Sequence, residues 1–449
     1  MPGRRRTQGR IGVVLLAGGA VATLLLAGCA RTPEHLPVGR WRATLELPGG
    51  TLPFGLEVAA PVKRSTSHPP VYILNGEDRI EVDEVQVERG VVSILMPGFK
   101  NRIDATLEGT SLRGTLTMIK AGAEEQKIPF AAERGIAWRF IPPDTPAAAP
   151  AGDVSGRWAV TFVDQDGKSY PAIGEFRQRG PEVTGTFLTP TGDHRFLAGE
   201  LQGRQLRLSK FDGGHPFLYE ATLQPDDTLA GQFWSGLAWT ETFTAHRDDA
   251  ASLGAAEQAT TMKEGVTRLD FRFPDLGGVY ISPSDPFYRG KVVVITLAGS
   301  WCPNCHDEAA FLAPLYREYR GKGLEIITLM FEQFGDFERA AEAVHRFRER
   351  YHIDYATLIA GISDKNDAAT RLPQLNGVFA FPTTLFVDRS GTVRRLHTGF
   401  SGPATGVHYE RLIAEFRQTI DSLLAEPAPP AAPLPLPGSA PEPTSAPAR

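Results

Sequence analysis

The sequence predicts a multidomain chain, with two N-terminal all-β repeats followed by one α/β domain. Between residues 39 and 246, apolar and polar residues alternate in short strands separated by turns that contain glycine. This period of two is typical of antiparallel sheets arranged as a barrel or a sandwich. From about residue 266 the pattern changes to strands alternating with helices, which is typical of an α/β domain. A chain of 449 residues is also too long for a single hydrophobic core.

The N-terminal segment has the composition of an export signal. Four arginines precede an apolar run over residues 11–27, and the sequence Leu-Ala-Gly-Cys then ends at Cys29. This sequence resembles the lipobox of bacterial lipoproteins, which implies that Cys29 is lipidated and becomes the first residue of the mature chain. We therefore expect an exported lipoprotein that faces the periplasm or the extracytoplasmic side and is anchored in the lipid bilayer through Cys29. The alternatives are an uncleaved signal anchor and an ordinary signal with an incidental cysteine.

Two stretches of the β-rich region look like copies of each other. Residues 39–45 and 156–162 both begin with Gly-Arg-Trp and continue with alternating apolar and polar positions. A second pair of similar stretches lies further along each copy. The long spacing between the copies indicates duplication of a whole small β-domain rather than a solenoid repeat. Trp41 and Trp158 are therefore expected in the cores of the two copies.

The remaining boundaries follow from composition. A Pro- and Ala-rich linker separates the β-copies, and the Pro- and Ala-rich tail has too few large side chains to form a core. Removal of the signal takes the formal charge from −5 to −9, because it contains four arginines and no acids. An acidic chain argues against nucleic acid as a partner. The predicted organisation is a signal peptide at 1–28, a first β-domain at 29–141, a linker at 142–153, a second β-domain at 154–247, a more helical connector at 248–265, the α/β domain at 266–425 and a disordered tail at 426–449.

The α/β domain is expected to be a mixed sheet covered by helices, ending in an antiparallel hairpin and a last helix. Pro382 opens one of its strands, either as a cis-proline or simply as the start of an edge strand. The predicted strands are 292–297, 324–330, about 355–359, 383–387 and 393–399, and the predicted helices are 303–320, 336–351, 364–372 and about 407–424.

The most informative motif lies after the first of these strands. Cys302 and Cys305, two of the three cysteines in the chain, are separated by two residues where an apolar strand meets a helix. The unpaired N–H groups and the dipole of a helix N-terminus stabilise a thiolate there. We expect Cys302, at the exposed end of the helix, to be the nucleophile and the more buried Cys305 to resolve the mixed disulfide. The motif predicts a thiol–disulfide oxidoreductase with no metal and no cofactor besides a redox-active disulfide.

The residues after the motif allow other interpretations. The segment from Cys302 to His306 also has the spacing of a c-type haem attachment site, although the mature chain offers only four methionines as a distal ligand. His306 is more easily explained as a solvated residue of the first helical turn. Asp307 is expected to complement the helix dipole. Glu308 could face inward beneath the sulfurs, where burial would raise its pKa and allow proton exchange with the thiols.

The α/β domain resembles the thioredoxin-fold lipoproteins and membrane-tethered proteins of the TlpA/ResA type. The resemblance spans roughly residues 266–425 and implies a thioredoxin fold with an insertion at about 332–372. It also implies exported thiol–disulfide exchange, usually in a reducing role. The stretches that carry it are 288–294, 301–305, 315–327 and 381–388.

Carried over motif by motif, the resemblance implies roles for individual residues. Cys302 would be the attacking thiol and Cys305 the resolving thiol, and Glu308 would be an acid that tunes both. Pro382 would be a cis-proline whose neighbouring backbone pairs with substrate like a strand. One departure from the family pattern is Thr296, which stands where thioredoxin itself has a buried aspartate. The residues expected to contact substrate are Trp301, Phe381 and Thr383.

The leading hypothesis is a lipid-anchored oxidoreductase that reduces disulfide-bearing envelope proteins. A membrane electron-donor protein would regenerate its dithiol, and the two β-domains would act as a spacer or recruit a partner. A disulfide-forming oxidant remains possible, because thiolates in such motifs span pKa values from about 3.5 to about 7. A peroxidase-like redoxin is a further possibility. An envelope binding or scaffold lipoprotein with a vestigial cysteine pair is the alternative outside the enzyme class.

Overall fold

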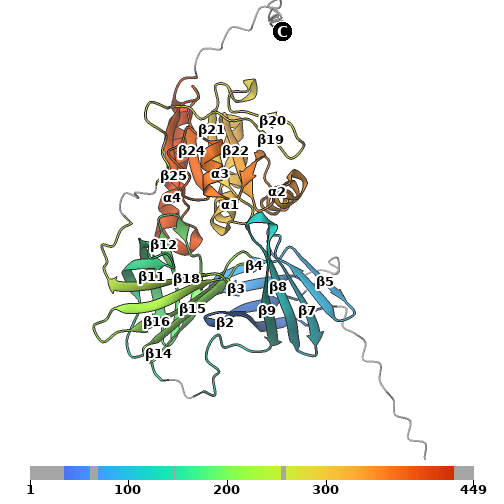
Figure 1. Cartoon of the computed structure of the whole chain (residues 1–449), viewed down its shortest axis with the longest axis vertical. Coiled ribbons are helices and arrows are strands. Elements are labelled where there is room, and N and C mark those ends of the chain that lie inside the picture. The colour runs from blue at the N-terminus through green and yellow to red at the C-terminus, as the bar shows by residue number, and fades with distance from the viewer. Residues whose placement is uncertain (1–34, 61–68, 146–147, 254–258, 429–449) are drawn as a thin grey trace, which may run out of the picture.

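The computed structural model describes residues 35–60, 69–145, 148–253 and 259–428, and shows two β-domains beneath one α/β domain (Figure 1). The predicted fold class is thereby confirmed. The predicted signal peptide, the lipidation site Cys29 and most of the C-terminal tail lie outside the described residues. None of the helices in the described ranges is long and apolar enough to cross a membrane.

The first β-domain is a single antiparallel sheet with two open edges. Its strands run in the order β4-β3-β2-β1-β9-β8-β7-β6-β5, so β4 and β5 form the edges of an open half-barrel. One short 3₁₀ turn, η1 (Ala121–Ala123), precedes the last strand. The strands are β1 (Gly39–Leu47), β2 (Gly50–Val58), β3 (Val71–Asn75), β4 (Asp78–Glu81), β5 (Glu84–Glu88), β6 (Val91–Leu95), β7 (Arg102–Glu108), β8 (Ser111–Ile119) and β9 (Glu125–Arg134).

The second β-domain closes into a barrel, because its early strands β11 and β12 pair with each other as well as with their other neighbours. Stacked and edge-on aromatic rings fill its interior around His194. The strands are β10 (Gly156–Asp164), β11 (Ser169–Arg179), β12 (Glu182–Thr189), β13 (Gly192–Asp193), β14 (Leu197–Gln202), β15 (Gln205–Phe211), β16 (Pro216–Leu223), β17 (Leu229–Ser235) and β18 (Trp239–Arg247).

The two β-domains share their local design. In each copy the first strand pairs with the second and with the last, β1 with β2 and β9, and β10 with β11 and β18. Trp41 Nε1 donates to the carbonyl of Pro37 at 3.2 Å, and Trp158 Nε1 donates to that of Val154 at 2.9 Å, four residues upstream in both cases. Both tryptophans are buried in their cores. The matching strand order and indole contacts support the inferred duplication.

The open half-barrel is completed by its neighbour. Phe211 and Leu218 of the second β-domain belong to the hydrophobic core of the first. Asn75 Nδ2, at the end of β3, donates to the carbonyl of Phe211 at 2.8 Å, and its Oδ1 accepts from the Phe211 N–H at 3.1 Å. Side chains of the second β-domain therefore complete the hydrophobic core of the first β-domain.

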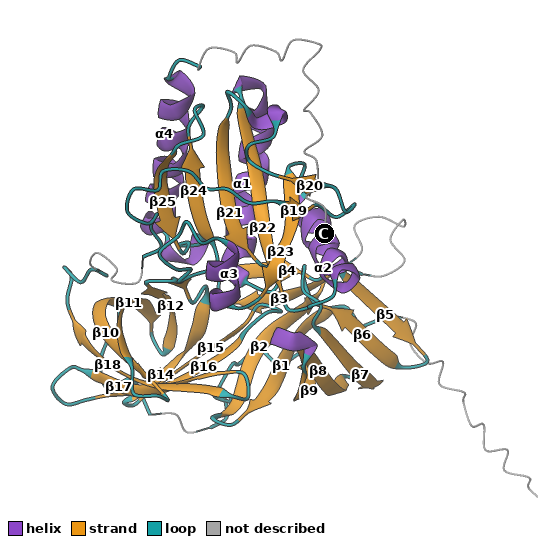
Figure 2. Ribbon diagram, turned by 45° about the horizontal axis from the view of Figure 1, so that its top comes forward, coloured by secondary structure: helices purple, strands orange, loops and turns teal. Residues whose placement is uncertain are grey.

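The C-terminal domain is built on a five-stranded mixed sheet in the order β23-β22-β21-β24-β25 (Figure 2). The strands β21 to β23 are parallel, and β24 and β25 are antiparallel to their neighbours. Its strands are β21 (Val292–Ala298), β22 (Leu324–Glu332), β23 (Ala356–Ile362), β24 (Thr383–Val387) and β25 (Val393–Thr398), with a short ribbon of β19 (Phe273–Pro274) and β20 (Tyr280–Ile281) before them. Its helices are α1 (Pro303–Tyr319), α2 (Phe337–Tyr351), α3 (Lys365–Arg371) and α4 (Val407–Ala425).

One expected element differs from the structure. The connector before the C-terminal domain was expected to be more helical, but residues 248–253 and 259–265 contain no helix. The described part of this segment instead adds an isolated bridge from Met262 to Leu375. Its backbone is thus held by pairing with the C-terminal domain.

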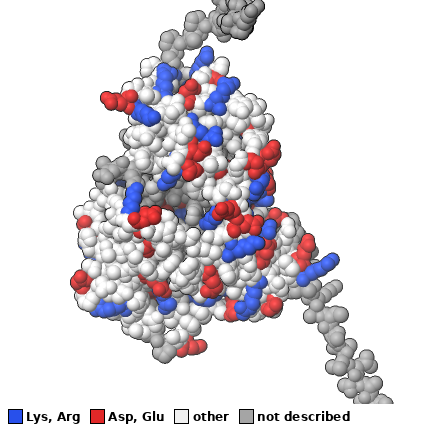
Figure 3. Space-filling model, viewed as in Figure 1, with Lys and Arg blue, Asp and Glu red and all other residues white. Residues whose placement is uncertain are grey.

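One face of the molecule carries mixed charge. On the face shown in Figure 3, lysines and arginines alternate with aspartates and glutamates, and no large area has a single sign. Ion pairs between partly or fully exposed side chains of the described residues include Arg79 with Glu57 and Arg417 with Glu318.

Candidate active site

Cys302 and Cys305 lie where the central strand β21 leads into helix α1. Both are free thiols, and Cys302 is the N-cap residue of the helix. The N–H of Cys305 donates to Cys302 Sγ at 3.3 Å, and the Cys302 thiol donates to the Phe381 carbonyl at 3.2 Å. Contrary to the expectation of an exposed end, Cys302 is only 5% exposed, because it belongs to the same apolar cluster as Phe381. The sulfur therefore sits in a recess rather than on an open surface.

Cys305 is the more deeply buried of the two thiols. Burial raises the pKa of Cys305 well above its ordinary value, and the Cys302 thiol and the nearby Glu308 carboxylate raise it further. A raised pKa keeps Cys305 protonated until a nearby group accepts its proton.

Glu308 lies in the interior between helix α1 and the sheet. It accepts a hydrogen bond from Thr296 Oγ1 at 2.6 Å and another from Thr384 Oγ1. These two threonines are paired directly across β21 and β24, so the antiparallel register places both hydroxyls at the same carboxyl group. Burial raises the pKa of Glu308 to about 7, although both hydrogen bonds lower it. Glu308 can thus gain or lose a proton near neutral pH.

The proline motif packs against the cysteine motif. The Phe381–Pro382 peptide bond is cis, and the Phe381 ring meets the Trp301 ring edge-on with centroids 5.7 Å apart. Trp301 Nε1 donates to the carbonyl of Phe331 at 2.8 Å. The Thr383 side chain is buried and donates to the Ala380 carbonyl at 2.9 Å. Substrate contacts by Trp301, Phe381 and Thr383 stay predictions.

Glu332 is a site residue that the sequence analysis missed. It ends strand β22, is almost fully buried, and accepts from the Ser300 N–H at 2.9 Å and from Ser300 Oγ at 2.6 Å. Burial raises the pKa of Glu332 to about 7. It fixes the loop that precedes Trp301. An acid that ends the apolar run Leu329-Met330-Phe331 was the available signal in the sequence.

His306 was expected to be solvated and Asp307 to complement the helix dipole, and both are buried. His306 Nε2 donates to the Ser300 carbonyl at 2.7 Å, and its Nδ1 accepts from the Tyr351 hydroxyl at 2.8 Å. Burial lowers the pKa of His306 to about 3, so the ring is neutral. With both nitrogens engaged, His306 has none free to ligate a haem iron in this arrangement.

Asp307 pairs with a residue of another domain. Arg195 Nη2, from the second β-domain, donates to Asp307 Oδ1 at 3.0 Å. Burial raises the pKa of Asp307 to about 7, while Arg195 lowers it. Asp307 thus connects the active-site helix to the barrel, in addition to any effect on the helix dipole.

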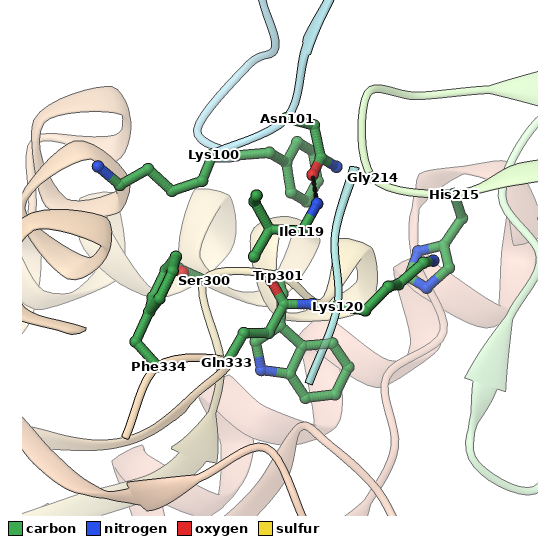
Figure 4. A pocket seen from close by; sticks show the side chains of 11 residues that line it. Lys100, Asn101, Ile119, Lys120, Gly214, His215, Ser300, Trp301, Gln333 and Phe334 are labelled. Carbon is green, nitrogen blue, oxygen red and sulfur yellow. Dashed lines mark hydrogen bonds between the residues drawn. The ribbon is translucent and has the colours of Figure 1, made fainter. Parts of the chain in front are cut away.

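The active-site loop lies at the junction of all three domains. A small cavity of about 30 Å³ borders Trp301 and Ser300 from the C-terminal domain (Figure 4). Its other walls include Lys120 of the first β-domain and His215 of the second. The N–H of Ala123 donates to the carbonyl of Gln333 at 3.0 Å, which ties the first β-domain to the end of β22. Within the described parts of the chain, no group of three or more His, Cys, Asp or Glu side chains could hold a metal ion.

Comparison with known proteins supports the chemistry of this site. A Redoxin family model matches residues 263–410. The thiol-disulfide oxidoreductase ResA of Geobacillus thermodenitrificans is 30% identical over 142 residues, which are 32% of this chain and 73% of the relative. ResA of Halalkalibacterium halodurans is 27% identical over 158 residues, 35% of this chain and 77% of the relative. The β-domains account for most of the chain outside these matches.

Two solved structures of similar proteins each cover somewhat more than a third of the chain. A putative thiol:disulfide interchange protein DsbE from Chlorobium tepidum shares 22% sequence identity, covering 36% of this chain and 99% of that protein, with a TM-score of 0.28. A DsbF homologue from Corynebacterium diphtheriae shares 19% identity, covering 38% of this chain and 97% of that protein, with a TM-score of 0.29.

The sequence relatives decide the family. The match to ResA reaches 30% identity over nearly three quarters of that protein. The Redoxin family model spans the strand, the cysteine pair and the helix that form the site described above. Through its C-terminal domain, the chain belongs to the ResA family of thiol–disulfide oxidoreductases.

Proposed function

We propose that this chain is an exported, lipid-anchored oxidoreductase that reduces disulfides of envelope proteins. Cys302 and Cys305 supply the two electrons, and a membrane electron-donor protein restores the dithiol. The observation that carries the direction of electron flow is the environment of Cys305.

The reaction has two exchange steps. The Cys302 thiolate attacks one sulfur of a substrate disulfide, the substrate S–S bond breaks, and the second substrate sulfur leaves as a thiolate that takes up a proton. Cys305 then loses its proton and attacks Cys302 Sγ, which forms the Cys302–Cys305 disulfide and releases the first substrate thiol. Two electrons pass to the substrate. Glu308, with a pKa of about 7, is suited to accept the Cys305 proton.

The proposed direction rests on which redox state the site favours. A strong oxidant of this class holds its reduced form as a stabilised thiolate. Here burial raises the pKa of Cys305, and the charged groups that act on it, the Cys302 sulfur and then the Glu308 carboxylate, raise it further. The surroundings thus disfavour the Cys305 thiolate of the reduced form, which supports a site that gives electrons away.

A measured reduction potential tests this direction. The full chain would be equilibrated with defined ratios of reduced and oxidised dithiothreitol, and the fraction of Cys302–Cys305 disulfide read by mass spectrometry after alkylation. A potential close to the value of about −270 mV for thioredoxin supports a reductase. A potential near the value of about −120 mV for DsbA would establish an oxidant instead.

Substrate trapping tests the roles of the cysteines. Cys305→Ala removes the resolving thiol, so mixed disulfides between Cys302 and envelope proteins should accumulate in cells. Cys302→Ala is the matched control and should accumulate none. Equal adduct levels in the two variants would show that Cys302 is not the attacking thiol.

The anchoring proposal rests on the segment that ends at Cys29 and is tested separately. Cells expressing the chain would be labelled with a radioactive fatty acid and fractionated. The native chain should carry label and sediment with membranes, whereas Cys29→Ser should be unlabelled. Equal labelling of both chains would rule out Cys29 as the lipidated residue.

A further inference from the structure

The second β-domain reaches into the cysteine motif itself. Asn304 is one of the two residues between the cysteines, and its side chain faces the turn that ends at Asp193 in strand β13. Asn304 Nδ2 donates to Asp193 Oδ1 at 2.9 Å and to the Asp193 carbonyl at 3.3 Å. A third acceptor, the Phe400 carbonyl, lies at 3.3 Å. The two N–H bonds of this amide are therefore directed to acceptors other than Cys302.

Asp193 is built into this position. Its side chain is buried, and besides Asn304 it accepts from the Gly402 N–H at 2.7 Å and from the Arg195 N–H at 2.9 Å. Gly402 belongs to the C-terminal domain and Arg195 to the barrel, so one carboxylate joins the two domains beside the redox centre. Buried carboxylates need such donors, because an unpaired one is costly.

The contact is tight on both sides. A Cβ added to Gly192 would lie 2.9 Å from Asn304 Cγ and Oδ1, and one added to Gly399 would lie 2.8 Å from the backbone carbon of Thr191. Both glycines have positive φ angles, +142° and +80°. Gly399 also donates its N–H to the Pro382 carbonyl at 2.8 Å. The barrel turn thus packs against both motifs of the site at once.

Buried ion pairs hold this turn in place. Arg195 contacts Asp307 on helix α1 and Asp212 on the barrel side, and Lys210 also pairs with Asp212. Other charged groups face the motif from within the C-terminal domain. These include Glu308 on helix α1, whose carboxylate adds to burial in raising the pKa of Cys305, and Lys365 on helix α3, whose own pKa is lowered by burial and raised less strongly by Cys302.

We propose that Asp193 is a positioning residue of the redox centre, contributed by the second β-domain. By binding the Asn304 side chain, it fixes the helical turn whose Cys305 N–H donates to Cys302 Sγ. The proposal rests on the role of Cys302 as the attacking thiol. With Asp193 in place, the Cys302 thiolate receives the hydrogen bond from the Cys305 N–H. The β-domain is then part of the catalytic apparatus, and its role exceeds that of a spacer.

The test follows the reactivity of Cys302 in the reduced full chain. The rate of alkylation of Cys302 by iodoacetamide would be measured against pH by mass spectrometry. Asp193→Ala removes the closest of the three acceptors of the Asn304 amide and loosens the turn between the cysteines. The Cys305 N–H should then stabilise the Cys302 thiolate less, and the midpoint of the alkylation profile should rise by about 0.5 to 1 pH unit. Asp193→Asn retains an oxygen that can accept from Asn304, and should move the midpoint by less than half as much.

Two further variants separate positioning from general effects. Glu175 is an interface carboxylate of the same β-domain that contacts His408 at 3.0 Å and no residue of the motif. Glu175→Gln should leave the profile unchanged. In an Asn304→Ala background, Asp193→Ala should cause no further shift, because the group it positions is gone.

Defined outcomes would overturn the proposal. The first is an alkylation profile of Asp193→Ala that matches the native profile. The second is a shift in Asp193→Asn or in Glu175→Gln as large as that in Asp193→Ala. The third is that Asp193→Ala causes its full shift even when it is introduced into Asn304→Ala. If Asp193→Ala does not fold, Gly192→Ala presses on Asn304 while keeping the carboxylate, and an unchanged profile there would equally refute the proposal. Alkylation reports on Cys302 whichever way electrons flow, so failure of the reductase proposal leaves this test valid.

Discussion

Replacing Glu308 by glutamine should change how the stability of the C-terminal domain depends on pH. Burial raises the pKa of Glu308 from its ordinary 4.5 to about 7 in the folded chain. Between these values the folded state binds a proton that the unfolded state has released. The contribution of Glu308 to the free energy of unfolding is therefore fully present below pH 4.5 and is lost as the pH rises through 7. Glutamine has a similar shape and does not titrate, so Glu308→Gln escapes this loss.

The size of the effect follows from the shift in pKa. Moving the pKa of Glu308 from 4.5 to about 7 corresponds to about 3 kcal/mol of unfolding free energy. The unfolding free energy of Glu308→Gln is to be compared with that of the native chain at each pH. Between pH 4.5 and pH 8, this difference should change by up to about 3 kcal/mol in favour of the variant. The threonine hydroxyls at this site can rotate to accept from the new amide, so the hydrogen bonds need not be lost.

Urea unfolding at the two pH values provides the measurement. Alkylation of Cys305, which is 1% exposed in the folded chain, reports the opening of this domain. Glu318→Gln, an exposed position on the same helix, is the control. If the native chain and Glu308→Gln lose stability equally between pH 4.5 and 8, the carboxyl group is not held protonated by burial, and the reasoning is refuted.

Three other substitutions probe the contacts between domains. Arg195→Ala leaves the buried Asp307 carboxylate without its partner and Asp212 with Lys210 alone, and should cost about 3 to 5 kcal/mol in urea unfolding. A loss below about 1 kcal/mol would show that these pairs are solvated. Gly399→Ala places a methyl group against the Thr191 backbone at a position with a positive φ angle. It should raise the rate of proteolysis at the contact between the second β-domain and the C-terminal domain. An unchanged rate would show that the turn at Thr191 can move aside. Phe99→Ala removes a ring stacked 4.3 Å from that of His306 and should lower the free energy of unfolding by about 3 kcal/mol. It should also speed amide hydrogen exchange in the first turn of α1. An exchange rate there equal to that of the native chain would contradict the stacking role.

The sequence was informative where the signal is local. The alternation of strands and helices after residue 266 gave elements that the structure places within a few residues, and the cysteine pair marked the site. Glu308 could be suggested from helical spacing, because three residues beyond Cys305 is nearly one turn. Its partners could not, since Thr296 and Thr384 are brought together only by the register of two antiparallel strands.

Contacts between domains were beyond the reach of sequence patterns. His306 was expected in solvent because it is polar and lies in the first turn of a helix, but the Phe99 ring of the first β-domain stacks on it. Asp193 and Asn304 are separated by 111 residues and lie in different domains. Nothing in either local sequence indicates that they meet. The closure of the second barrel and the openness of the first are equally matters of long-range pairing, although both copies begin alike.

The unequal closure of the two β-copies has a consequence for the order of events during synthesis. The interior of the first copy includes Phe211 and Leu218, which belong to the second. A ribosome makes residue 134, the end of the last strand of the first copy, well before it makes these two side chains. Until then the half-barrel lacks one wall and exposes apolar surface to water. The duplicated copies therefore mature as one folding unit, and a truncated chain that ends between them should aggregate rather than survive as a small stable barrel.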